Sequence, residues 1–191
     1  MFNKKELLLC LLAFTICFVL STALEVYQTP EKVIAQTHQD LLNRQKFNEI
    51  AYTKIMFDAS IDPRSEGFTA PQNDTLYGAA LFDVRHEPVV LIQGDVDEGR
   101  YWVHELVNEK NEVVNYIGAY SDGYKAKKYL ITGKTFSGPT PPGIDRVVET
   151  KAGIVWDLYR IYAKDKDDFV AADAQRRDVK VLTLSEYLNN K

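Results

Sequence analysis

The sequence predicts a mainly β fold of the α+β class: an antiparallel β-sandwich-like domain with an N-terminal helical segment and a short C-terminal helix. Short segments rich in Val, Ile, Leu and Tyr follow Thr75 and are separated by Gly, Asp, Asn and Pro, which is typical of antiparallel sheets. They are preceded by a segment that begins with a proline and whose apolar residues recur at helical spacing. Of the 191 residues, 46% are hydrophobic, which is enough to fill one core without disulfides.

The first 23 residues predict a signal peptide. Lys4 and Lys5 precede an apolar run from Leu7 to Leu20, and Ser21-Thr22-Ala23 places small residues where signal peptidase cuts. We therefore expect cleavage after about Ala23 and a secreted or periplasmic chain. The alternative is an uncleaved membrane anchor, because residues 7–24 are just long enough to span a bilayer.

The cysteines and the charge exclude several classes of function. Both cysteines, Cys10 and Cys17, lie inside the apolar run, so the processed chain would have no thiol for a disulfide, a nucleophile or a metal site. The formal net charge is −4 and no block of basic residues occurs, which argues against nucleic acid as a partner.

Residues 24–72 are predicted to form a helical segment followed by a loop. Thr29-Pro30-Glu31 favours a helix start, because Thr can cap free amides, Pro suits the first helical position and Glu suits the positive end of the helix dipole. Apolar residues recur at loose helical spacing from Glu31 to about Phe57, which fits one bent helix or two short ones. The stretch from Asp58 to Gln72 collects Pro and Gly and is expected to be a loop.

Residues 73–191 are predicted to form the β-rich domain, with residues 24–191 as one folded unit. A helix is expected from Asp167 to Arg177, because acidic residues stand at its start and basic residues at its end, and a short strand from Lys180 to Leu184 should follow. The expected strands before this helix are Leu76 to Val84, Pro88 to Gln93, Tyr101 to Val107, Val113 to Ala119, Lys128 to Thr132, Arg146 to Glu149 and Ile154 to Ile161.

Two catalytic motifs begin in this sequence but are incomplete. Gly133-Lys134-Thr135 ends like a phosphate-binding loop, yet Lys128 stands where the first glycine is required. His104-Glu105 begins like a zinc-protease helix, yet Asn108 replaces the second histidine. Neither motif therefore predicts its usual chemistry.

The histidines are weak candidates for a metal site. His86 and His104 could combine with Asp83 or Glu105, since imidazole and carboxylate ligands suit zinc or iron. The alternative is that each histidine is an ordinary strand or turn residue. We expect no cofactor.

Several sequence blocks follow one another in a specific order: Asn73-Asp74-Thr75-Leu76-Tyr77, Phe82-Asp83-Val84, Glu87-Pro88-Val89-Val90-Leu91, Arg100-Tyr101-Trp102, Tyr116-Ile117-Gly118, Tyr129-Leu130-Ile131-Thr132-Gly133 and Val155-Trp156-Asp157-Leu158-Tyr159-Arg160. This series resembles the DUF1254 family from about Val33 to Leu184. The resemblance implies an exported protein with a β-sandwich-like domain and no established activity. It also implies that a DUF1214 domain, which often follows in the family, is missing here.

The block that opens the β-rich domain holds the candidate binding residues. Asn73 and Asp74 could simply close a turn by bonding nearby amides. Alternatively Asn73, Asp74 and Tyr77 converge with Arg160 on a polar pocket for a small ligand. Asn73 also begins an N-x-T sequon, which would accept a glycan in a eukaryotic secretory pathway if it were exposed.

The sequence therefore predicts an exported, noncatalytic domain that binds a small molecule or a protein partner. One alternative is an enzyme with a polar or metal-dependent site for a small organic or carbohydrate-like substrate. Another is a structural subunit that pairs with itself or with a separate DUF1214-like chain, because a missing second domain can leave an apolar face exposed.

Overall fold

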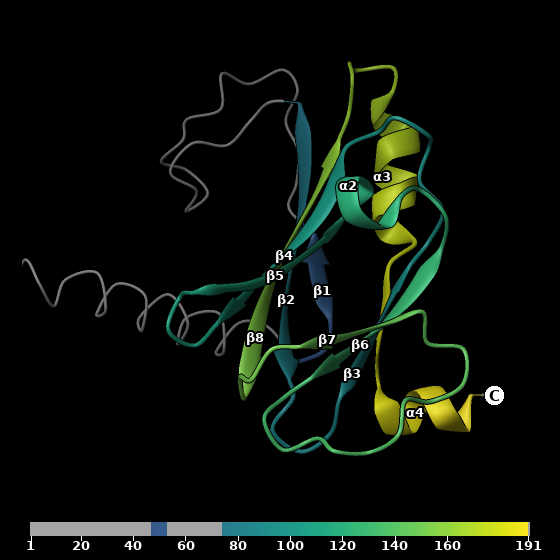
Figure 1. Cartoon of the computed structure of the whole chain (residues 1–191). Helices are drawn as coiled ribbons and strands as arrows, with labels where there is room; N and C mark the ends of the chain where they lie inside the picture. Colours follow the sequence, from purple (N-terminus) through teal and green to yellow (C-terminus); the bar gives the residue numbers. More distant parts are fainter. Residues whose placement is uncertain (1–46, 53–73, 191) are drawn as a thin grey trace, which may run out of the picture. The chain divides into compact units, whose positions relative to one another are not determined.

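The computed structural model describes residues 47–52 and 74–190 (Figure 1). Every described residue belongs to one compact unit, which lies within Leu42–Lys191. The predicted leader at residues 1–23, most of the predicted segment 24–72 and Asn73 lie outside the described residues.

The predicted mainly β fold is confirmed. The described residues form nine strands and three short helices. The strands are β1 (Ile50–Tyr52), β2 (Thr75–Asp83), β3 (Val89–Gln93), β4 (Trp102–Asn108), β5 (Val113–Gly118), β6 (Lys127–Thr132), β7 (Arg146–Glu149), β8 (Ile154–Tyr162) and β9 (Lys180–Thr183), and the helices are α2 (Ala119–Asp122), α3 (Phe169–Arg177) and α4 (Leu184–Asn189).

The strands form two sheets. The five-stranded sheet has the order β1-β2-β8-β4-β5 and is antiparallel throughout, whereas the four-stranded sheet has the order β7-β6-β3-β9. The expectation of purely antiparallel pairing is wrong at one place, because β6 and β7 run parallel. The proline-rich loop between them carries the chain back to the same end of the sheet, as a parallel pair requires.

The main core contains residues of both sheets. Side chains that alternate along the strands pack into one buried cluster, which includes Leu76 and Phe82 of β2 and Ile161 of β8 together with Leu91 of β3 and Ile131 of β6. Alternation places these residues on one face of each sheet, which is the arrangement of a β-sandwich. The sandwich-like expectation therefore holds for this core.

A second, smaller core lies on the other face of the four-stranded sheet. Val90 of β3 and Leu130 of β6 alternate with the main-core residues of the same strands and pack with Tyr187 of α4. This sheet is thus buried on both faces, which explains why Val89-Val90-Leu91-Ile92 is a continuous apolar run.

The predicted strands from residue 75 to residue 162 are confirmed within one or two residues at each end. The predicted helix from Glu31 to Phe57 is wrong where the structure can test it, because Ile50–Tyr52 form strand β1 and pair antiparallel with β2. Ile50 packs against the main core. A single buried apolar residue is compatible with a strand as well as with a helix, so the spacing alone did not distinguish the two.

The C-terminal segment contains an element that the sequence did not predict. The predicted strand that ends at Leu184 stops at Thr183, because Thr183 caps helix α4. The Thr183 hydroxyl accepts a hydrogen bond from the Glu186 amide, and the Glu186 carboxylate accepts one from the Thr183 amide at 2.8 Å. This reciprocal capping box starts a helix at the residue where the strand was expected to continue.

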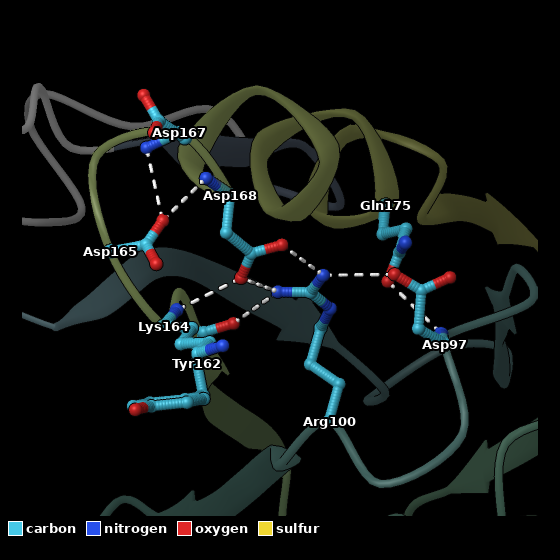
Figure 2. A network of polar contacts seen from close by, with 8 residues as sticks. All are labelled: Asp97, Arg100, Tyr162, Lys164, Asp165, Asp167, Asp168 and Gln175. Carbon is cyan, nitrogen blue, oxygen red and sulfur yellow. Dashed lines mark hydrogen bonds and ion pairs between the residues drawn. The ribbon is translucent and has the colours of Figure 1, made fainter.

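Helix α3 is confirmed, and the acidic residue directly before it, Asp168, binds an arginine from another segment. The Asp168 side chain makes no cap hydrogen bond to the helix. Figure 2 shows instead that its two oxygens accept from the Arg100 guanidinium, at 2.7 Å each. Arg100 is buried and also donates to the Tyr162 carbonyl and to Asp97, so one cation ties the loop before β4 to the start of α3. Charge-assisted, bidentate contacts of this kind are the strong ones among hydrogen bonds.

Candidate functional site

Two of the residues predicted for the polar pocket lie side by side. Tyr77 of β2 and Arg160 of β8 are cross-strand partners in the five-stranded sheet. Asp74 stands directly before β2, where its carbonyl accepts from the Ala163 amide at 2.8 Å and its carboxylate accepts from the Thr75 hydroxyl at 3.2 Å. Asn73, together with its possible glycosylation, lies outside the described residues.

Strand register shows that Tyr77 and Arg160 occupy the outer face of the sheet. Their neighbours Leu76, Ile161 and Trp102 form a cross-strand row that faces the main core. Side chains alternate between the two faces of a sheet, so the residues of the adjacent rows point away from the core.

Three neighbouring rows of this outer face carry four tyrosines around one ion pair. We call Tyr77, Tyr101, Tyr116 and Tyr162, with Arg160 and Glu105, the tyrosine surface. Register defines its rows, which are Thr75–Tyr162–Tyr101, Tyr77–Arg160–Val103–Gly118 and Ala79–Leu158–Glu105–Tyr116.

The ion pair of the tyrosine surface joins two strands and is partly open to solvent. Arg160 Nη1 lies 2.7 Å from Glu105 Oε2, and the two side chains are 31% and 17% exposed. The Tyr116 hydroxyl donates to Glu105 Oε1 at 3.4 Å. The nearby Glu105 charge raises the pKa of Tyr116, so this hydroxyl stays protonated at neutral pH.

The aromatic rings beside this pair are well exposed. Tyr101 is 52% exposed and Tyr116 is 54% exposed, while Tyr77 and Tyr162 are half-buried. Gly118 belongs to the middle row, between the row of Tyr101 and the row of Tyr116. A Cβ added to Gly118 would lie 2.6 Å from the Trp102 carbonyl oxygen. A side chain is therefore excluded at that place.

His104 faces the opposite way and is enclosed in the interior. Its Nδ1 lies 3.0 Å and 2.9 Å from the two carboxylate oxygens of Asp157, and its Nε2 lies 3.0 Å from Gln93 Oε1. All three side chains are fully buried. Both ring nitrogens therefore face oxygen atoms, and the Asp157 carboxylate accepts the hydrogen bond from a proton on Nδ1.

Aromatic rings complete the surroundings of His104. The ring of Tyr159 stacks on the imidazole at 4.2 Å between centroids, and the ring of Trp102 meets its edge at 6.0 Å. The Tyr159 hydroxyl lies beside Gln93, and burial raises its pKa well above the ordinary value. Because Gln93 belongs to the four-stranded sheet and His104 to the five-stranded sheet, this buried cluster links the two.

The weak metal candidates lie in different surroundings. His86 is exposed in the turn after β2, whereas His104 is buried on β4. Their candidate carboxylate partners are both engaged elsewhere, Asp83 with Arg85 at 2.7 Å and Glu105 with Arg160. No group of three or more metal-ligating side chains occurs within residues 47–52 and 74–190.

Sequence reasoning missed Asp157 and Gln93. A signal for Asp157 was present, because it is the one carboxylate in the strand Ile154–Tyr162 and has apolar neighbours on both sides; the structure places it at an inward position. A carboxylate at such a position requires a buried partner. No comparable signal marks Gln93, whose partner depends on how the two sheets pack.

Comparison with known proteins places this fold in a family. The family model described as a protein of unknown function, DUF1254, matches residues 52–183. A solved structure, the VPA0106 protein from Vibrio parahaemolyticus, is similar with a TM-score of 0.67 and 24% sequence identity. The similarity covers 82% of this chain but only 36% of that one. No curated protein matches the chain.

The helices of the described part are all short. None of them has the length and apolar character that crossing a membrane requires.

Proposed function

This chain belongs to the DUF1254 family, and we propose that it is an exported, noncatalytic binding module that holds a small ligand or a protein partner on the tyrosine surface. Export rests on the basic, apolar and small-residue pattern of residues 1–23.

The observation that carries this proposal is the composition of the tyrosine surface. Two half-exposed rings, Tyr101 and Tyr116, flank the Arg160–Glu105 pair on one face of a rigid sheet. Tyr and Arg are enriched at recognition surfaces. Tyr offers a large contact area and a polar group with little loss of conformational freedom, and Arg offers a planar group with several donors. The histidine with a carboxylate partner, His104, is enclosed in the core, which favours binding over catalysis as the role of the domain.

Site-specific photo-crosslinking in the native cells tests this proposal. A photoreactive phenylalanine analogue at position 116 should capture a defined molecule, which mass spectrometry of the adduct identifies. The same analogue at position 188 is the control, because Leu188 is also about half exposed but lies on α4. Absence of an adduct at position 116, or the same adducts at both positions, would sink the proposal.

A second candidate function is a structural subunit that pairs with itself or with a separate DUF1214-like chain. In the Vibrio structure this fold accounts for 36% of a longer chain, so in that protein it stands beside further chain. Sedimentation of the exported chain separates the candidates. A monomer that still gives the position-116 adduct supports the binding module, whereas a stable homo-oligomer supports the subunit.

A further inference from the structure

We infer that the ligand of the tyrosine surface is a neutral, hydroxyl-rich molecule of the saccharide class, which stacks on Tyr101 and Tyr116 and bonds to Arg160 and Glu105. This inference rests on the proposed binding function and names the class of ligand.

The hydrogen-bonding groups of the ion pair match those of neighbouring hydroxyls. Glu105 forms an ion pair with Arg160 and accepts from the Tyr116 hydroxyl, yet an ionised carboxylate offers about four acceptor sites. A guanidinium has five N–H donors, and in the described part of the chain Arg160 uses Nη1 toward one carboxylate. A donor and an acceptor therefore lie side by side, and a pair of sugar hydroxyls can bond to both at once, because each hydroxyl donates and accepts.

The charge of the surface favours a neutral ligand. Its three rows carry one cation, Arg160, and one anion, Glu105, which neutralise each other at 2.7 Å. An acidic ligand would have to displace Glu105 from its partner, and a basic ligand would be repelled by Arg160. A neutral polar molecule meets neither cost.

The exposed rings supply the remaining contact. Tyr101 and Tyr116 present apolar faces to solvent, and no side chain stands at Gly118 between them. The flat C–H face of a sugar ring can pack on such a surface while its hydroxyls reach the ion pair.

An extended peptide at the sheet edge fits the structure less well. Strand β5 is the edge next to this surface, and the Gly118 amide that points outward there already donates to Asp122 at 3.3 Å. A bulge at Leu106/Val107 also disturbs the pairing of β4 with β5 near the other end of β5. Bulges and covered amides protect an edge from strand addition. Binding through the face of the sheet is therefore favoured over binding through its edge.

The test is an array of neutral and acidic oligosaccharides probed with the purified exported chain. We expect binding to neutral saccharides that weakens about tenfold in Tyr116→Ala and at least as much in Arg160→Met. Leu188→Ala, which changes an exposed side chain on α4, should bind saccharides as strongly as the unchanged chain. Glu105→Gln should move the preference toward acidic saccharides, because it removes the charge that neutralises Arg160.

Two results would overturn the assignment. One is the absence of any saccharide binding above the level of Tyr116→Ala, and the other is binding that is equal in Arg160→Met and in the unchanged chain. If the position-116 crosslink captures a protein while no saccharide binds, the ligand class is wrong and the proposed binding function stands. If neither is found, both are wrong.

Discussion

Replacing Asp157 with alanine should destabilise the domain more than any change at its surface. Asp157 is fully buried, and both of its oxygens lie within 3.0 Å of His104 Nδ1. Asp157→Ala leaves the imidazole in the core with nothing to accept its Nδ1 proton. Leaving a buried donor without its acceptor costs about 1 to 3 kcal/mol, and more where the lost acceptor is a carboxylate.

The loss can be followed by urea unfolding and by thermal unfolding, both monitored by tryptophan fluorescence. Trp102 lies 6.0 Å from His104 between ring centroids and reports on the site directly. For a chain of this size, 1 kcal/mol changes Tm by about 2 to 4 °C, so the expected decrease in Tm is at least about 2 to 12 °C. The matched control is Glu105→Ala, which breaks the partly exposed pair with Arg160 and should cost about 0 to 1 kcal/mol.

A third variant separates the lost hydrogen bonds from the packing. Combining His104→Phe with Asp157→Leu removes both polar groups and fills the site with apolar atoms, which should restore much of the stability. The reasoning is refuted if Asp157→Ala costs no more than Glu105→Ala, or if the double variant is less stable than Asp157→Ala alone.

Three further outcomes are expected. Hydrogen bonds from Arg100 and from the Lys164 amide lower the pKa of Asp168 from 3.8 to about 2, so the stabilising contribution of Asp168 is complete above about pH 4 and is lost as the pH falls toward 2. The difference in urea midpoint between the unchanged chain and Asp168→Asn should therefore disappear over that range. A difference that persists at pH 2 would contradict this expectation. Gly133→Ala should lower the unfolding free energy of the domain by about 1 to 3 kcal/mol in urea unfolding, because the new Cβ would lie 2.4 Å from the Val84 carbonyl oxygen. An unchanged unfolding free energy would contradict this close approach of the two backbone segments. The intact mass of the exported chain should correspond to a start at about Leu24, and a mass that includes residues 1–23 would show that the leader is retained.

Local pattern was sufficient to predict most of the strands. Ile154–Tyr162 is rich in β-branched and aromatic residues, and this composition predicted the strand. Its burial alternates over the whole length, although apolar residues such as Trp156 and Leu158 stand on the outer face. Ile50–Tyr52 is too short to show a period, and its strand character depends on pairing with β2. Helix α4 was missed because its start depends on a capping box at the end of a strand-like segment.

The candidate sites could be predicted only in part. Tyr77 and Arg160 were selected as residues of one site, and the register that makes them neighbours joins strands far apart in the sequence. The His104 cluster needs Asp157, 53 residues further on, and Gln93 from the other sheet. A single sequence carries no direct information about such pairings, because they are decided by strand order and sheet packing.

The opposite orientation of the two polar clusters allows stability and binding to be separated. His104 and Asp157 point inward from β4 and β8, whereas Glu105 and Arg160 point outward from the same two strands. Changes to the inward pair should lower the unfolding free energy and leave the affinity of the folded protein nearly unchanged. Changes to the outward pair should do the reverse, because exposed ion pairs contribute little to stability. If instead Asp157→Asn weakened binding without loss of stability, the interior pair would act on the ligand, and the distinction between a binding face and a structural core would fail.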